Sequence, residues 1–283
     1  MRRLIASAAA LAALLTGLFA QPAATAGADT QTHYYLSLGD SLAESYQPDG
    51  VLDQGYAEQL HTLLAADDPK LKLTKLGCGG ESTRSLRFGS QDPSLVSSCG
   101  TQRFYQHRYP KGTQLAEAIH FLTKHRGKVD LITIDIGAND LSRLDDQGNE
   151  VICLFEPLGC NAQNQQIATN LASILAQLHA AAPGVPVVGM TYYNAFAPIW
   201  YSDLELGQLV SDRMDGLNEI LDTSYAAAAS PVADVAGAFE NGVFPESADN
   251  ACAWTWFCTV GDFHLNTEGY GVVAYEYLAS IQQ

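Results

Sequence analysis

Short apolar runs alternate along the chain with longer segments in which apolar residues recur every three or four positions. The short runs predict buried strands of a parallel sheet, which form nearly continuous apolar stretches. Alternation of such strands with helices predicts a three-layer α/β/α sandwich with a parallel sheet of about five strands. The predicted strands are 34–38, 71–76, 129–136, 185–190 and 232–235.

The longer segments have the apolar spacing of amphipathic helices. Two of them also end in helix stop signals: basic residues precede Gly127, and Pro183 and Gly184 follow an alanine-rich turn. The predicted helices are 55–66, 113–127, 164–184, 206–229 and 267–281.

The N-terminus has the residue order of a secretory signal peptide. A basic start precedes an apolar run from Leu4 to Ala20, and small residues follow up to Ala26. This order predicts a signal peptide of residues 1–26 and one secreted, mature domain of residues 27–283. A membrane anchor is the alternative, but Gly17 and the Gln21-Pro22 break leave the run short for a span. We therefore expect no stable membrane insertion.

The chain is strongly acidic. Its formal net charge of −16 becomes −18 without the predicted signal peptide, because that segment holds Arg2 and Arg3 and no acidic residue. Such a surface repels phosphate backbones and anionic membranes, so we expect no nucleic-acid partner. We expect a monomer.

The cysteine pattern predicts disulfides. An even number of cysteines in an exported chain favours pairing, and the residues cluster locally as 78–99, 153–160 and 252–258, although other pairings are possible. A zinc site is the alternative, but the chain has no C-x-x-C and no histidine close enough to complete one. We expect no metal. The cysteines are Cys78, Cys99, Cys153, Cys160, Cys252 and Cys258.

Polar and glycine-rich segments follow the predicted strands. Ser41 follows the first strand, "LGCGGEST" the second, "IGANDL" the third and "TYYN" the fourth, and "GDFHLN" precedes the last helix. Ligands of open parallel sheets bind at the carboxyl ends of the strands. These segments therefore converge on one edge, although small polar residues are also common in turns of no further function.

A serine hydroxyl needs a base to act as a nucleophile, and acyl transfer needs donors for the oxygen that becomes negative. We choose His264 as the base because it lies in a loop, whereas the predicted helices contain His61, His120, His125 and His179, which we expect to be surface or packing residues. The candidate donors are the Ser41 and Gly80 backbone N–H groups and the Asn139 amide.

Four of these segments resemble the conserved blocks of the SGNH (GDSL) hydrolase superfamily: Gly39-Asp40-Ser41, Gly80, Gly137 to Asp140, and His264. The resemblance implies a flavodoxin-like sandwich and a secreted bacterial esterase or lipase without a cofactor. It assigns Ser41 as the nucleophile, His264 as the base, and Ser41, Gly80 and Asn139 as the oxyanion hole. The G-x-S-x-G of common α/β-hydrolases does not occur in the sequence.

One position departs from that superfamily. Its last block has an aspartate three residues before the histidine, but Gly261 occupies that position here and the aspartate is Asp262. Either Asp262 orients His264, or a backbone carbonyl such as that of Gly261 does so and leaves a Ser-His dyad. We favour Asp262, because a nearby carboxylate stabilises the imidazolium during turnover. Asp40 and Asp140 are expected to secure turns.

The substrate is less well defined by the sequence. Trp254 and Trp256 precede His264, and Tyr192, Tyr193 and Asn194 follow the fourth strand. These side chains fit a substrate site for small acyl esters, lipids or acetylated sugars, and they fit structural packing equally well. The leading hypothesis is a carboxylic-ester hydrolase; the alternatives are a polysaccharide acetylesterase and a non-catalytic secreted binding protein on the same fold. Residues 145–150 lack the ligand pattern of a calcium loop and predict a solvated turn.

Overall fold

The computed structural model describes residues 31–89, 109–145 and 147–282. These residues belong to one compact unit. The predicted signal peptide and its cleavage point at Ala26 lie outside the described ranges and stay predictions.

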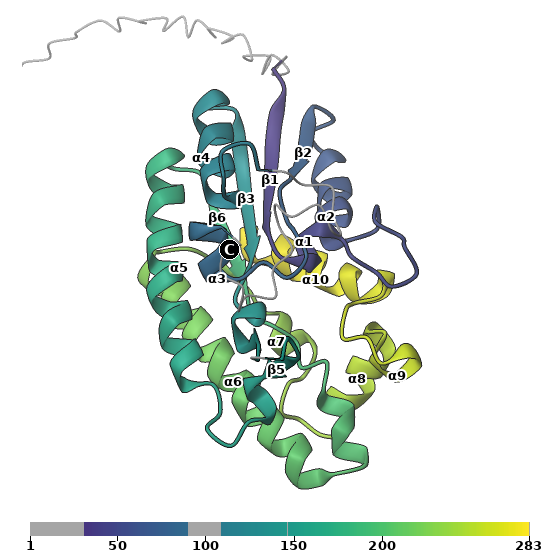
Figure 1. The fold of residues 1–283 in the computed structure, drawn as a ribbon. Helices are drawn as coiled ribbons and strands as arrows, with labels where there is room; N and C mark the ends of the chain where they lie inside the picture. The colour runs from purple at the N-terminus through teal and green to yellow at the C-terminus, as the bar shows by residue number, and fades with distance from the viewer. Residues whose placement is uncertain (1–30, 90–108, 146, 283) are drawn as a thin grey trace, which may run out of the picture. The chain divides into compact units, whose positions relative to one another are not determined.

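The centre of the unit is a five-stranded sheet in the order β2-β1-β3-β6-β7 (Figure 1). Every pair of neighbours is parallel. This order is that of the flavodoxin-like fold, in which β2 is added on one side of β1 and the later strands on the other, so that the topological switch point lies between β1 and β3. The predicted strands are confirmed as β1 (His33–Gly39), β2 (Leu71–Lys75), β3 (Val129–Asp135), β6 (Val187–Met190) and β7 (Val232–Ala233).

Helices cover both faces of the sheet, as expected for a three-layer sandwich (Figure 1). The pair α2 (Tyr56–Ala65) and α10 (Thr267–Ile281) pack together, with the rings of Tyr56 and Tyr277 stacked 4.9 Å apart. In a second group of helices, α5 contacts the other three, and α3 also contacts α4. The group consists of α3 (Thr83–Phe88), α4 (Gln114–Lys124), α5 (Asn161–Ala181) and α6 (Leu204–Ala227). All five predicted helices are therefore present.

Short elements were missed by the sequence analysis, because few of them are long enough to show an apolar period. Two of them form an antiparallel hairpin whose turn is closed by Asp145, which accepts the N–H groups of Gln147 and Asn149. The missed elements are α1 (Ser41–Glu44), η1 (Ala138–Leu141), β4 (Ser142–Leu144), β5 (Glu150–Ile152), η2 (Cys153–Phe155), η3 (Ala197–Tyr201), α7 (Val235–Ala238), α8 (Glu246–Trp254), α9 (Phe257–Val260) and α3.

Two disulfides form as predicted, Cys153–Cys160 and Cys252–Cys258. The predicted partner of Cys78, Cys99, is outside the described ranges, so that pairing stays a prediction. Among the helices that the structure describes, none has both the length and the apolar character needed to cross a bilayer.

Candidate active site

Ser41 lies where the central strand β1 meets the short helix α1. Gly39, at the end of the strand, has φ +133°, and a Cβ there would lie 2.1 Å from the Asp135 carbonyl oxygen. Asp40 then caps α1, because its Oδ1 accepts the Leu42 N–H at 2.9 Å. Ser41 is consequently the first residue of the helix, and its backbone N–H has no partner within the helix. The tight turn places both its hydroxyl and its N–H at the carboxyl edge of the sheet.

Three side chains from two distant parts of the chain meet at this edge. Ser41 Oγ lies 2.8 Å from His264 Nε2, and His264 Nδ1 lies 2.7 Å from Asp262 Oδ1. The same Asp262 oxygen accepts the His264 backbone N–H at 2.8 Å. The aspartate two residues before the histidine therefore contacts the imidazole nitrogen that faces away from Ser41, where the sequence left a choice between this carboxylate and the Gly261 carbonyl.

The electrostatics of Asp262 agree with this contact. Partial burial acts to raise the pKa of its carboxyl group, but the hydrogen bonds from the His264 side chain and backbone hold that pKa below its ordinary value. Asp262 is therefore ionised at neutral pH and able to accept the Nδ1–H of the imidazole.

The loop that carries His264 is held on several sides. The Trp256 backbone N–H donates to the His264 carbonyl at 2.9 Å, and the Tyr193 hydroxyl donates to the Phe263 carbonyl at 3.1 Å. The Tyr46 ring packs against the imidazole with its centroid 4.5 Å away. These contacts limit the movement of the imidazole relative to Ser41.

Asn139 lies beside Ser41, in the 3-10 turn η1 that follows β3. Its Nδ2 donates to the Glu81 carbonyl at 3.1 Å and to Asp40 Oδ2 at 3.3 Å. Gly80 precedes Glu81 in the turn after β2 and has φ +74°. The structure thus brings Asn139 into the site with Ser41, and places Gly80 next to the carbonyl that Asn139 contacts.

The two other aspartates of the motifs hold turns, as the sequence analysis expected. Asp140 accepts the Thr83 backbone N–H at 2.7 Å and the Thr83 hydroxyl at 2.6 Å, which attaches the start of α3 to η1. Burial raises the pKa of Asp140 to about 6. Asp40 Oδ2 also accepts the Tyr192 hydroxyl at 2.9 Å.

Asp135, which the sequence analysis missed, holds the turn that carries Ser41. Its buried carboxylate accepts the backbone N–H groups of Asp40 at 3.1 Å and Ala43 at 3.3 Å, and the Tyr56 hydroxyl at 2.5 Å. Burial, with the nearby charge of Asp40, raises the pKa of Asp135 well above its ordinary value. A signal existed in the sequence, because an acidic residue in the apolar run "LITIDIG" is rarely buried without a specific partner.

Gln114 was also missed, since it lies inside a predicted helix. Its side chain accepts the Gly39 N–H at 2.7 Å and donates to the Gly39 carbonyl at 2.9 Å, so it pairs with both backbone groups of the last residue of β1. It also donates to Glu81 Oε2 at 3.1 Å. Burial raises the pKa of Glu81 to about 7. Buried hydrogen bonds among Gly39, Gln114 and Glu81 therefore hold the carboxyl end of β1 in place.

A pocket opens at Ser41. Ser41, Asn139 and His264 line it on one side, and the remaining walls are largely apolar. Its empty volume is about 680 Å³ including the open mouth. The apolar walls come from η1, β5, η2, α6 and the segments after β6 and before α10: Leu141, Ile152, Leu154, Tyr192, Tyr193, Ala195, Phe196, Met214 and Phe263.

Only one of the three predicted substrate residues lines this pocket. Tyr192 lines it, but Asn194 and Trp254 do not. Asn194 is buried, where its Oδ1 accepts the Phe196 N–H at 3.1 Å and its own N–H donates to Asn241. Trp254 packs edge-on against Phe239 with ring centroids 4.9 Å apart. Both have structural contacts in place of a position on the pocket wall.

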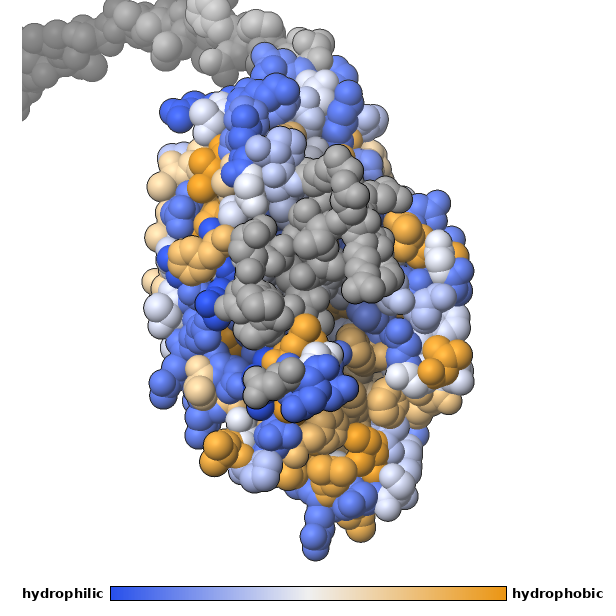
Figure 2. All heavy atoms as spheres, in the orientation of Figure 1, coloured by the Kyte–Doolittle hydropathy of each residue, from blue (hydrophilic) through white to orange (hydrophobic). Residues whose placement is uncertain are grey.

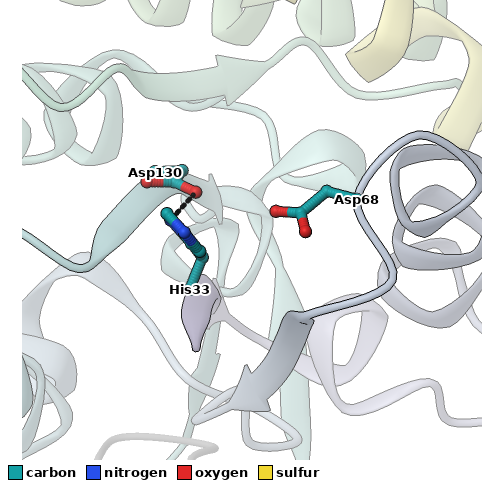
Figure 3. A group of neighbouring side chains, drawn as sticks. All are labelled: His33, Asp68 and Asp130. Atoms are coloured by element: carbon teal, nitrogen blue, oxygen red, sulfur yellow. Dashed lines mark ion pairs between the residues drawn. The ribbon is translucent and has the colours of Figure 1, made fainter. Parts of the chain in front are cut away.

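At the opposite end of β1, His33 lies near Asp68 and Asp130 (Figure 3). One possible ligand atom from each lies within 4.8 Å of the others, and His33 Nδ1 is 3.0 Å from Asp130 Oδ2. Asp68 Oδ1 already accepts the Lys70 N–H at 3.0 Å. The group begins the strand that Ser41 follows, so the length of β1 separates it from the chemistry of Ser41.

The fold and the site together define an α/β/α hydrolase with a serine, a histidine and a carboxylate at the carboxyl edge of its sheet. The model of the GDSL-like lipase/acylhydrolase family matches residues 37–272. The chain belongs to this family and is an acylhydrolase, which acts on esters. Among curated proteins, none matches the chain.

Solved structures share the fold. A lipase from a goat rumen metagenome has 16% identity and a TM-score of 0.57, covering 88% of this chain and 97% of its own. An extracellular lipase from Streptomyces rimosus has 15% identity and a TM-score of 0.54, covering 88% and 100%. An acetyl-xylooligosaccharide esterase from Geobacillus has 15% identity and a TM-score of 0.55, covering 89% and 94%.

Proposed function

We propose that this protein is a secreted serine esterase or lipase that hydrolyses carboxylic acyl esters through an acyl-enzyme on Ser41. The observation that carries the proposal is the pair of contacts at His264, 2.8 Å to Ser41 Oγ and 2.7 Å to Asp262 Oδ1, at the edge of an apolar pocket. Export is inferred from the predicted signal peptide and is supported by the two disulfides.

In the first half of the reaction, Ser41 Oγ attacks the ester carbonyl carbon while its proton passes to His264 Nε2. The negative oxygen then accepts the Ser41 and Gly80 N–H groups and one Nδ2–H of Asn139, which gives up its 3.3 Å contact with Asp40. Collapse of this intermediate breaks the bond to the alcohol, which leaves with the proton from His264. Asp262 stabilises the imidazolium between these two proton transfers.

In the second half, a water molecule donates a proton to His264 Nε2 and attacks the acyl carbon. The intermediate again places its negative oxygen on the same donors. Its collapse breaks the bond to Ser41 Oγ, returns the proton from His264 to that oxygen and releases the carboxylic acid. No cofactor enters these steps.

The apolar pocket walls favour an acyl group longer than acetyl. Leu154, Phe196 and Met214 line the pocket beyond the reacting atoms. An acetyl group would leave much of this apolar surface in contact with water, whereas a longer chain would bury it. A lipid or simple acyl ester is therefore the first candidate substrate, and an acetylated polysaccharide is the second.

A hydrolysis panel tests this proposal. p-Nitrophenyl esters with acyl chains of two to sixteen carbons and acetylated xylan are offered to the mature protein, with Ser41→Ala as the blank. We expect chains longer than acetate to be preferred; release of acetate from xylan without action on longer esters would identify the polysaccharide acetylesterase instead. A fluorophosphonate probe should label Ser41, and should still label Ser142→Ala, which changes the other serine of the pocket. Absence of any label on the wild-type protein would favour the non-catalytic binding protein.

A further inference from the structure

Two segments next to disulfides carry exposed apolar side chains. The first, between Cys153 and Cys160, exposes 40% of Phe155 and 92% of Leu158. The second segment follows the Cys252–Cys258 disulfide and exposes 64% of Val260 and 41% of Phe263. Leu154 of the first segment and Phe263 of the second line the pocket. Isolated exposed apolar residues are ordinary, but two pairs of them in segments that line one pocket are not. We call these four residues the apolar rim.

Ring contacts make the apolar rim continuous with the pocket. Phe196, which lines the pocket, packs edge-on against Phe155 at 5.3 Å and against Phe257 at 5.7 Å, and lies 6.2 Å from Phe263. Figure 2 shows apolar atoms on this face between the places where Figure 1 labels β5 and α8, next to the hydrophilic atoms at β5. An acyl chain that enters the pocket therefore passes between apolar surfaces on both sides.

The first loop is attached firmly to the protein. Arg213, from α6, donates to the Leu154 carbonyl at 2.6 Å and to the Cys153 carbonyl at 3.3 Å. Gly159 packs over the Arg213 side chain, since a Cβ there would lie 3.3 Å from its Nε. A loop held in this way loses little conformational entropy when its apolar tip is buried against a partner.

The charge around the apolar rim restricts the partner. Residues 142–160 contain Arg143 against four carboxylates, and residues 252–266 contain Asp262 and neither lysine nor arginine. The whole chain has a formal net charge of −16. Anionic lipid surfaces repel such a region, whereas neutral or zwitterionic surfaces do not.

We propose that the apolar rim seats the protein on neutral or zwitterionic lipid surfaces, so that an acyl chain passes directly from the lipid into the pocket. This inference rests on the proposed function for its purpose, because the surface that surrounds an ester-hydrolysing pocket meets the aggregate that supplies the ester. The physical driving force is the transfer of the Leu158 and Val260 side chains, which do not line the pocket, from water into the acyl region.

Vesicle flotation tests the proposal in a Ser41→Ala background, in which no lipid is consumed. We expect binding to phosphatidylcholine vesicles, at least tenfold weaker binding by Leu158→Ser with Val260→Ser, and weaker binding of the parent to phosphatidylglycerol vesicles. The matched control is Tyr275→Ser on α10, whose side chain is 63% exposed and which should bind like the parent.

A second arm uses the protein with Ser41 intact. The Leu158→Ser, Val260→Ser variant should hydrolyse soluble p-nitrophenyl butyrate within twofold of wild type, which also shows that it is folded, and emulsified tributyrin at least tenfold more slowly. The proposal is overturned if the parent does not bind phosphatidylcholine vesicles, or if the parent and the double variant bind them equally. It is also overturned if the parent binds phosphatidylglycerol vesicles more strongly than phosphatidylcholine vesicles. A dimer in ultracentrifugation that the double substitution abolishes would likewise overturn it. Failure of the proposed function is a separate result: no soluble ester is hydrolysed, while vesicle binding is still measured.

Discussion

One oxygen of Asp262 accepts both N–H groups of His264, the imidazole Nδ1–H at 2.7 Å and the backbone N–H at 2.8 Å. A single carboxylate oxygen therefore fixes both the course of the chain and the orientation of the ring. This arrangement needs the aspartate two residues before the histidine. Gly261, three residues before His264, has φ +74° and ends helix α9, and the carboxylate comes from the residue after it.

Substitution Asp262→Asn should lower kcat for a soluble ester by more than tenfold, with KM changed less than threefold. The amide does not stabilise the imidazolium, and it favours the wrong tautomer of His264. The measurement is steady-state kinetics on p-nitrophenyl butyrate. Asp249→Asn, on α8, is the control for loss of a carboxylate and should retain wild-type kcat. A loss of less than tenfold at Asp262 would leave His264 supported by other groups.

Substitution Asn139→Ala should lower kcat by about 10²- to 10³-fold, since that is the usual effect of removing one oxyanion donor. KM should change little, because the donor acts mainly on the oxygen that becomes negative in the transition state. Fluorophosphonate labelling should slow in parallel, and urea unfolding should measure the stability that is lost with the contacts to Glu81 and Asp40. Unchanged kcat in a folded variant would remove Asn139 from the oxyanion hole.

Substitution Met214→Phe should shift the preference toward shorter acyl chains. Met214 lines the pocket from α6, and the larger, stiffer ring reduces the space for distal carbons. We expect the ratio of kcat/KM for octanoate to that for acetate to fall by about tenfold, within the usual range for pocket discrimination. Leu209→Phe on the same helix is exposed and should leave the ratio unchanged. Equal ratios in all three proteins would place the acyl chain elsewhere.

The buried Glu81 makes stability depend on pH. Burial raises its pKa from 4.5 to about 7, so in the folded state it keeps its proton where the unfolded chain loses it. Its contribution is fully present below pH 4.5 and is lost as pH rises to about 7, a change of roughly 3 kcal/mol at 1.36 kcal/mol per pH unit.

Glu81→Gln should therefore weaken the fall in unfolding free energy between pH 4.5 and pH 7. Urea unfolding at four pH values in this range measures the slope. The variant loses one acceptor of the Ser85 and Gln114 contacts, which lowers stability at every pH and leaves the slope as the informative quantity. Glu156→Gln, in the exposed disulfide loop, is the control. If the slopes of wild type and Glu81→Gln coincide, the proton is held by another group of the network.

Much of the architecture is encoded locally. The inner strands β1, β3 and β6 are largely buried and appear as apolar runs, and the five long helices have a regular apolar period, so the positions of these elements follow from side-chain hydrophobicity. The bounds of α10, Thr267–Ile281, agree with the prediction. The hairpin of β4 and β5 was missed because its three-residue strands are stabilised by pairing and by the neighbouring disulfide, and neither has a period of its own.

The chain by itself determined which chemical groups are present at the carboxyl ends of the strands: the Ser41 hydroxyl, the Asn139 amide and the His264 imidazole. Only the tertiary structure decided which oxygen contacts His264, that Asn194 and Trp254 lie away from the pocket, and that Asp135 and Gln114 hold the turn at Gly39 and Asp40. The reason is physical. Hydrophobic periodicity is a property of neighbouring residues, whereas hydrogen-bond partners and pocket walls depend on distances between segments that are far apart in the chain and meet only after folding.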